Sequence, residues 1–320
     1  MPTKPFHWPG STLLMAFIIA LGTMGSLRAQ TPSDATLMHS KNICLLFATD
    51  FGAFNQYWEG ELLRENQTVA TVHRYTSTTM AAIGVLDKLD FYVGVPYVTT
   101  RSSKPNGGKF AGVSNFQDII FAAKYQVLNF QSEKGQFLFL TTVGYSTPIS
   151  DYLSDYKPYS IGLGAPEFSA RGILQYKTAF GLFLRGDVAH LWRGYTKAER
   201  DYYYNDGSYY TAWMDVPDAW NYEAALGLWC FSNSLKFEVN YFGLKSTSGD
   251  DIRPYNAAQP TNKVEVDRVG ASIQYFLPRT GFGAIVYHNR VIEGRNVGKS
   301  HNTGIGVTYQ FSIKKKQHEE

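Results

Sequence analysis

Charged side chains recur at every second position within several otherwise apolar stretches of the 320-residue sequence. Arg185 and Asp187 are separated by one residue, and so are Lys236 and Glu238. Side chains two residues apart in a β-strand point to the same face, so each pair would share one face of a strand. Opposite charges on neighbouring strands form ion pairs and hydrogen bonds. The chemistry that these residues indicate is a polar lattice or a solute path, with no covalent step.

The sequence lacks the patterns that bond-breaking chemistry needs. His73, His190 and His288 have no nearby nucleophile or acid in the arrangement of a hydrolase. No zinc-ligand spacing, glycine-rich phosphate loop or metalloprotease helix occurs. The only two cysteines, Cys44 and Cys230, lie far apart, and their spacing supports neither a metal site nor a disulfide. We therefore expect no catalytic residues, no metal site and no cofactor.

One predicted loop, 195–217, is unusually rich in tyrosine and tryptophan. These rings are rigid amphipathic surfaces that stack on sugars or aromatic solutes, or that pack a loop over its own scaffold. Both interpretations stay open at this point. The recognition candidates are Tyr202, Tyr203, Tyr204, Tyr209, Tyr210 and Trp213.

Composition excludes several classes of protein. The 30 basic and 27 acidic residues nearly balance, which argues against a nucleic-acid binder. Charged residues make up only 18% of the chain and aromatic residues 15%, which argues against intrinsic disorder. Two cysteines are too few for a disulfide-rich scaffold.

Residues 1–29 have the pattern of a cleaved secretory signal peptide. Lys4 precedes the apolar run 13–21, small residues follow the run, and Ala29 provides a cleavage point. The alternative is a retained helical anchor, but the run is short of the roughly 20 residues that a spanning helix needs. We expect an exported protein of a Gram-negative bacterium.

The rest of the chain alternates with the period of β-strands. In 303–313, odd positions are apolar or Thr and even positions are Gly, Thr, Gln or Ser. Segments 119–127, 235–241 and 269–277 follow the same rule, so each strand would have one oily face and one polar face. The fold class predicted is all-β, an antiparallel transmembrane β-barrel of about 12 strands, with 10 or 14 as alternatives. The strands are expected at 56–64, 68–85, 89–100, 115–129, 135–149, 160–175, 178–194, 218–231, 235–246, 264–277, 281–292 and 301–313.

Short and long connections alternate between these strands. Short periplasmic turns and long outer loops are typical of an outer-membrane barrel, whereas a soluble β-sandwich has no reason to alternate them. Both termini would then lie in the periplasm. The expected organisation is a periplasmic segment over 30–55, the barrel over 56–313 and a charged tail over 314–320. Aromatic residues on the oily face gather near both strand ends, as in the two interfacial girdles of such barrels.

The polar face of the predicted strands would line the lumen. Basic side chains that face hydrocarbon would cost about 2–4 kcal/mol each near the midplane, so charged positions within strands must point inward. These side chains either form a lattice that fills and stiffens the lumen, or line the wall of a narrow conduit. Barrels of about eight strands are filled by their own side chains and barrels of 16–18 strands enclose a wide channel, so a barrel of about 12 strands lies between the two. The predicted lumen-lining residues are Arg74, Asp118, Lys124, Glu167, Arg171, Arg185, Asp187, Glu223, Lys236, Glu238 and Arg268.

Residues 83–130 carry a family resemblance. Val95-Pro96-Tyr97 is followed by the glycine-rich stretch Asn106-Gly107-Gly108, and then by Asp118 ahead of Ala123-Lys124-Tyr125. In these motifs the chain resembles bacterial outer-membrane β-barrel transporters associated with the phenol meta-cleavage degradation pathway. The tail departs from that pattern because seven polar residues follow Ile313, where such barrels end on an aromatic residue. The resemblance implies an outer-membrane barrel with a role in small-molecule uptake.

The leading hypothesis is a channel or transporter for passive passage of a small solute, with hydrophobic and aromatic solutes as candidates. The alternative is a structural or surface-recognition barrel with a plugged lumen, in which the loop 195–217 binds the partner. An enzyme is the weakest of the three. The expected partners are outer-membrane lipid, the barrel assembly machinery and the solute, and no nucleic acid.

Overall fold

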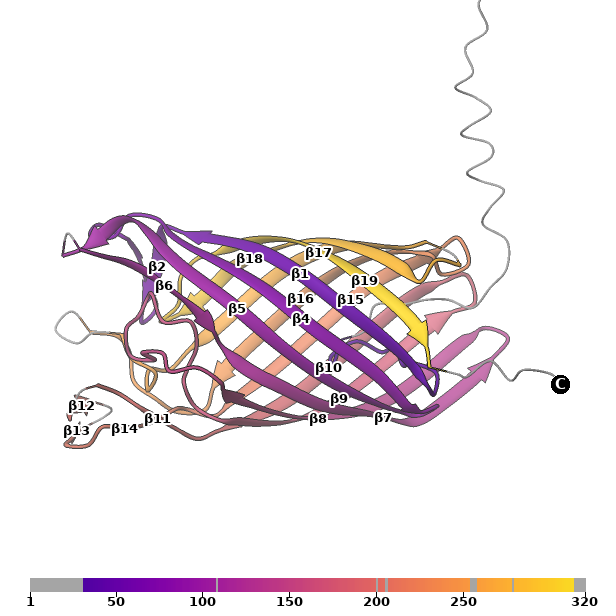
Figure 1. Cartoon of the computed structure of the whole chain (residues 1–320), viewed down its shortest axis with the longest axis horizontal. Coiled ribbons are helices and arrows are strands. Elements are labelled where there is room, and N and C mark those ends of the chain that lie inside the picture. The colour runs from indigo at the N-terminus through magenta and orange to yellow at the C-terminus, as the bar shows by residue number, and fades with distance from the viewer. Residues whose placement is uncertain are drawn as a thin grey trace, which may run out of the picture.

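The computed structural model describes residues 31–107, 109–199, 201–204, 207–253, 258–277 and 279–313. The predicted signal peptide 1–29 and the tail 314–320 lie outside these ranges. Thirteen strands pair in one antiparallel sheet, in which β6 pairs only with β5 and the other twelve form a ring closed by β1 and β19. Figure 1 shows these strands running obliquely around the barrel. The prediction of a twelve-stranded antiparallel barrel is confirmed.

The ring strands have the following bounds: β1 Asn42–Phe54, β4 Val72–Leu86, β5 Leu89–Asn106, β7 Asp118–Ser132, β8 Gly135–Pro148, β9 Glu167–Thr178, β10 Leu182–Arg193, β15 Ala219–Cys230, β16 Leu235–Ser246, β17 Glu265–Phe276, β18 Phe282–Arg295 and β19 His301–Ser312. The remaining strands are short or lie outside the ring: β2 Gln56–Glu59, β3 Leu62–Glu65, β6 Phe110–Phe116, β11 Tyr195–Lys197, β12 Tyr203–Tyr204, β13 Ser208–Tyr209 and β14 Trp213–Asp215. No helix among the described residues is long and apolar enough to cross a membrane.

The predicted position of the first strand is wrong. Residues 56–64 form the β2–β3 hairpin in a loop, and the barrel begins instead at Asn42. β1 pairs along its length with β4 and β19. Its pattern is blurred in the sequence because Cys44, on the inward face, is buried in an apolar cluster with Met38. The strand count is right because one misplaced strand replaced another.

Connections alternate in length as expected. The turns β4–β5, β7–β8, β9–β10, β15–β16 and β17–β18 span at most five residues and lie at one end, which we call the short-turn end. The loops at the other end are long except for β18–β19, which spans five residues, and β11 to β14 lie within the longest of them (Figure 1). Described residues at both ends of the chain, Lys41 and Ile313, meet at the short-turn end through a backbone hydrogen bond of 2.8 Å.

The outer surface of the barrel is apolar and is bordered by aromatic rings. Along β10, buried inward residues alternate with exposed outward residues such as Leu184 and Val188. Tyr176 and Tyr309 are exposed near the short-turn end, and Trp192 is exposed near the opposite end. A band of aliphatic side chains between two aromatic belts fits a lipid bilayer and its two interfaces.

The Val95-Pro96-Tyr97 motif lies where β5 changes its partner. β5 pairs with β7 up to Gly94 and with β6 from Tyr97 onward. Between them the Gln117 N–H donates to the carbonyl of Pro96 at 2.9 Å. Proline has no N–H to donate, so it suits this interruption of the ladder.

Candidate functional site

The eleven charged residues predicted to line the lumen occupy the inward register positions of their strands. Arg171 pairs with Asp187 on β10 and donates to the Asn221 amide oxygen at 3.1 Å. Arg185 lies between two carboxylates, pairing with Glu223 and, at 3.2 Å, with Glu238. Lys236 in turn lies 3.3 Å from Glu238. These side chains form the ion-pair lattice that the sequence indicated, and it spans β9, β10, β15 and β16.

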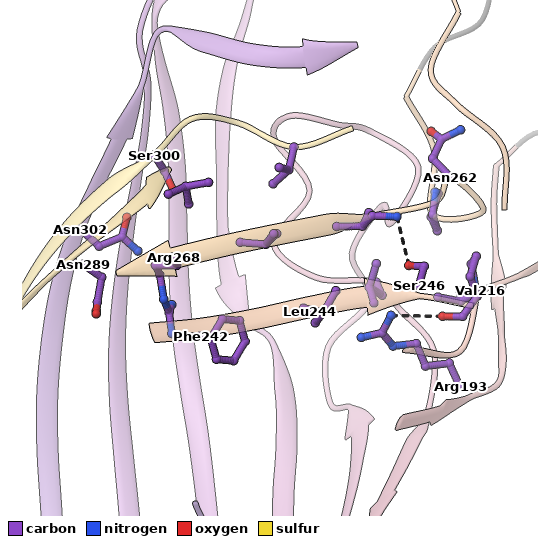
Figure 2. A pocket seen from close by; sticks show the side chains of 17 residues that line it. Arg193, Val216, Phe242, Leu244, Ser246, Asn262, Arg268, Asn289, Ser300 and Asn302 are labelled. Atoms are coloured by element: carbon purple, nitrogen blue, oxygen red, sulfur yellow. Dashed lines mark hydrogen bonds between the residues drawn. The ribbon is translucent and has the colours of Figure 1, made fainter. Parts of the chain in front are cut away.

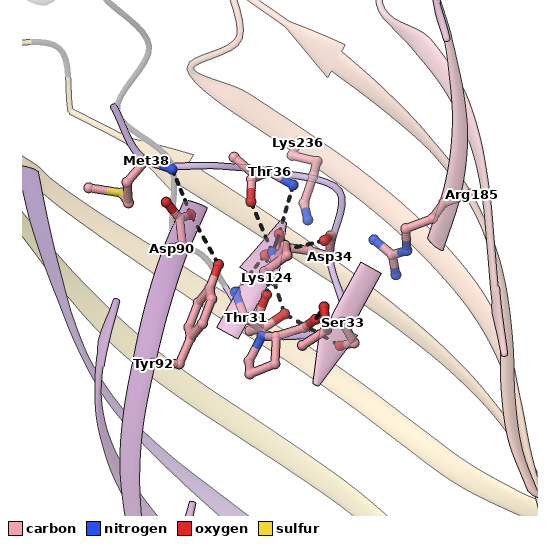
Figure 3. A network of polar contacts seen from close by, with 12 residues as sticks. Thr31, Ser33, Asp34, Thr36, Met38, Asp90, Tyr92, Lys124, Arg185 and Lys236 are labelled. Carbon is pink, nitrogen blue, oxygen red and sulfur yellow. Dashed lines mark hydrogen bonds and ion pairs between the residues drawn. The ribbon is translucent and has the colours of Figure 1, made fainter. Parts of the chain in front are cut away.

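Residues 31–38, ahead of β1, lie inside the barrel, and residues 39–41 lie at the short-turn end, where the Ser40 N–H donates to the Asp87 carboxylate. We call residues 31–41 the lumenal segment, and Figure 3 shows its contacts with the wall. The Lys124 ammonium, whose side chain is 0% exposed, donates to the carbonyls of Thr31 at 2.7 Å and of Asp34 and Thr36 at 2.9 Å. It also pairs with the Asp34 carboxylate at 2.9 Å. The prediction of a periplasmic segment over 30–55 is therefore wrong for these residues.

Apolar contacts hold the same segment against the wall. Ala35 clusters with the inward side chains of Leu138, Leu140 and Ile173. Met38 packs in a second cluster that includes Tyr92, and its N–H donates to the Asp90 carboxylate at 2.8 Å. A lumen filled with water would expose these apolar side chains, so their burial depends on the segment.

At the long-loop end, the loop 149–166 folds over the lumen. Arg74 donates to the carbonyls of Ser160 at 3.4 Å and Ile161 at 2.6 Å. Tyr152 donates to the carboxylate of Asp118 at 2.6 Å. Two of the predicted lumen residues therefore anchor a loop as well as line the wall. Glu167 has a similar structural role, because it accepts from Arg193 at 2.8 Å.

Beneath this loop lies a mostly apolar cavity of about 340 Å³, which we call the upper chamber (Figure 2). Its walls come from the inward faces of β16, β17 and β18 and from loop residues. Phe242, Leu244, Val266 and Val291 supply much of the lining, and Arg268 is the predicted lumen residue that borders it.

A larger cavity of about 720 Å³, the mouth cavity, lies among the long loops. It shares Leu163, Val264 and Val297 with the upper chamber, so the two cavities are neighbours. Lys157 lines the mouth cavity and donates to the Gln259 carbonyl at 3.1 Å. Burial, together with the charge of Arg193, lowers the pKa of Lys157 to about 8, so it remains mainly cationic at neutral pH.

The tyrosine-rich loop is built largely from its own aromatic contacts. Tyr203 is buried and stacks on Tyr209 with ring centroids 5.2 Å apart, while Tyr202 meets Tyr210 at 5.3 Å. The Tyr204 carbonyl accepts from the Gln259 amide at 2.6 Å, which ties the loop to 247–263. Tyr202, Tyr209, Tyr210 and Trp213 are exposed. Neither the mouth cavity nor the upper chamber is lined by these residues, and their role in recognition stays a prediction.

Sequence reasoning missed the lumenal segment and the upper chamber, although the sequence carries a signal for both. Leu138, Leu140 and Ile173 occupy inward positions where a hydrated lumen would favour polar residues. Phe242 and Leu244 do the same on β16. Apolar residues at inward positions mark places where something other than water covers the wall.

Replacing Arg185 by alanine should make the lumen more selective for cations. Glu223 and Glu238 would lose their shared guanidinium, leaving two carboxylates without this partner. Breaking a buried pair on one side typically costs about 3–5 kcal/mol, so thermal stability should also fall. The reversal potential in a KCl gradient should shift toward that of K⁺. Lys134→Ala, on the β7–β8 turn, removes the same charge outside the lumen and should leave the potential unchanged. An unshifted potential in a folded Arg185→Ala barrel would place Arg185 off the ion path.

Comparisons with known proteins agree with this architecture. The crystal structure of the COG4313 outer membrane channel from Pseudomonas putida F1 is similar with a TM-score of 0.70 and 9% identity, covering 88% of this chain and all of that one. The translocator domain of the autotransporter NalP from Neisseria meningitidis matches with a TM-score of 0.44, 12% identity and coverage of 94% and 95%. The CymD monoaromatic hydrocarbon channel matches with a TM-score of 0.40, 9% identity and coverage of 86% and 90%. The first of these shows a shared fold, and the other two support no inference about this chain.

No curated protein matches the sequence. A scan against protein families matches residues 64–311 to the family described as "Putative MetA-pathway of phenol degradation". The match spans eleven of the twelve ring strands in full or nearly so, and includes all the residues that line the upper chamber. The chain belongs to this family of the phenol degradation pathway.

Proposed function

We propose that the protein is an integral outer-membrane channel for passive passage of small, apolar or aromatic solutes. The observation that carries this proposal is the upper chamber, a mostly apolar cavity inside a barrel whose lumen also carries an ion-pair lattice on β9, β10, β15 and β16. An apolar chamber within a polar lumen favours solutes with an apolar body over sugars and ions. Membership of a family tied to phenol degradation supports an aromatic solute.

Uptake by cells tests this function. A Gram-negative host without general porins would produce the protein, and initial uptake of labelled phenol and labelled glucose would be measured at low concentration. We expect the protein to raise phenol uptake with little change in glucose uptake. Equal stimulation of both would indicate a general pore, and no stimulation with retained phenol binding would favour the alternative of a recognition barrel.

The lumenal segment fills part of the lumen, and this observation favours the alternative of a recognition barrel with a plugged lumen. Four hydrogen bonds to Lys124 and two apolar clusters hold this segment in the lumen. We propose that the segment is a removable barrier, because most of its polar contacts with the wall come from Lys124 and its apolar contacts are small. The Asp90 carboxylate and the Thr142 hydroxyl add one hydrogen bond each.

Export and assembly complete the proposal. We propose that residues 1–29 are removed on export and that the barrel assembly machinery inserts the mature chain into the outer membrane. We assign no enzymatic activity to the protein.

A further inference from the structure

The upper chamber contains a cation that makes no ion pair with the described residues. The Arg268 guanidinium lies over the ring of Phe242, with its central carbon 4.4 Å from the ring centroid. Its Nε is buried and has no hydrogen-bond partner among the described residues. Arg193 also borders the chamber, but it is bound to Glu167 and to the carbonyl of Pro217. Arg268 is therefore the guanidinium available to a ligand there.

The nearest acidic groups are engaged elsewhere. Glu223 and Asp50 are the carboxylates whose charges act on Arg268. Glu223 pairs with Arg185, and Asp50 accepts from the Tyr287 hydroxyl at 3.4 Å. A buried donor left unpaired costs free energy, and a charged donor costs more than a neutral one. A ligand that brought its own anion would remove this cost.

The remaining walls determine what else the ligand must be. Leu244, Val264, Val266 and Val291 present aliphatic surface next to the guanidinium, and Asn289 and Asn302 add neutral amides. An inorganic anion would find few further donors and would face mainly apolar side chains. A planar guanidinium matches a carboxylate in bidentate geometry, and the apolar walls match a hydrocarbon or aromatic body.

We propose that the upper chamber binds small apolar monocarboxylates, with the carboxylate on Arg268 and the apolar body against the β16–β18 wall. The ring of Phe242 holds the guanidinium in place by a cation–π contact. This inference rests on the proposed function, since it names the class of solute that the channel selects. Benzoate is the simplest probe of that class, and benzamide is its neutral analogue of nearly equal shape.

Calorimetric titration of the purified full-length protein in detergent tests the inference. Benzoate should bind more tightly than benzamide, and Arg268→Gln should weaken benzoate binding about tenfold or more while leaving benzamide binding unchanged. Arg290→Gln is the matched control, because Arg290 lies on the exposed outer face of β18 and carries the same charge. Its benzoate affinity should equal that of the native chain.

Two results would overturn the inference: equal affinity for benzoate and benzamide in the native protein, or unchanged benzoate affinity in a folded Arg268→Gln barrel. Neither binding result depends on the proposed function, because that function is tested separately by phenol uptake. A channel that carries phenol but binds benzoate no better than benzamide would retain the function and lose the preference for carboxylates.

Discussion

Replacing Lys124 by methionine is expected to raise the ion conductance of the barrel severalfold. The ammonium has three N–H donors and lies within 2.9 Å of four oxygens of the lumenal segment, one of them in the Asp34 carboxylate. A hydrogen bond to a charged group contributes about 1.5–3 kcal/mol, and each 1.4 kcal/mol changes an equilibrium about tenfold. Losing these bonds, and leaving Asp34 unpaired in the lumen, should shift the segment toward states in which it has left the wall.

Single-channel recording in planar bilayers measures this effect. Lys177→Met is the matched control, because Lys177 also faces the lumen, where it donates to Asn233 and lies over the Trp229 ring. Heat-modifiable mobility on gels would show that each variant has folded. Conductance of a folded Lys124→Met barrel equal to that of the native protein would mean that the ammonium does not hold the barrier.

Replacing Val188 by arginine is expected to prevent most of the chain from assembling. Val188 lies near the middle of β10, and its side chain is 52% exposed on the outer face. An arginine near the bilayer midplane costs about 2–4 kcal/mol, a large part of the typical 5–15 kcal/mol stability of a folded domain. Its register neighbours Gly172 and Tyr222 offer no acidic partner.

The yield of folded barrel in outer-membrane fractions checks this prediction. Val188→Leu keeps an apolar side chain at the same site and should assemble at the native level. Normal assembly of Val188→Arg would reverse the inside–outside assignment of β10, and the assignment of Arg185 and Asp187 to the lumen would fail with it.

The fold was predictable from the sequence wherever one face of a strand meets lipid and the other meets polar groups. β19 and β10 alternate cleanly because Val307 and Leu184 face outward while their neighbours Gly306 and Arg185 face inward. β1 escaped prediction because Cys44, Leu46 and Ala48 on its inward face are apolar, and Cys44 packs against Met38 of the lumenal segment. The predicted first strand, 56–64, is the hairpin β2–β3, whose two short strands pair with each other outside the ring.

The candidate site was predictable in its residues but not in its partners. All eleven charged positions could be assigned to one face from alternation and from the cost of charge in hydrocarbon. The contact of Lys124 with Asp34 joins positions 90 residues apart, and no local pattern specifies it. Arg268 likewise lacks an ion-pair partner among the described residues because Glu223 pairs with Arg185 and Asp50 accepts from Tyr287, and no local pattern specifies these contacts.

Tethering the lumenal segment to the wall tests most directly whether solutes pass this end of the lumen. The Thr142 hydroxyl donates to the carbonyl of Pro32 at 2.9 Å, so cysteines at these two positions would be close neighbours. In a chain with Cys44→Ser and Cys230→Ser, a Pro32→Cys, Thr142→Cys disulfide should hold the segment closed. Conductance of the double-cysteine variant in planar bilayers should be minimal when the disulfide is formed and should rise when it is reduced. The conductance of each single-cysteine variant should not change on addition of the reductant. Equal conductance of the oxidised and reduced double variant would contradict a path controlled by the lumenal segment.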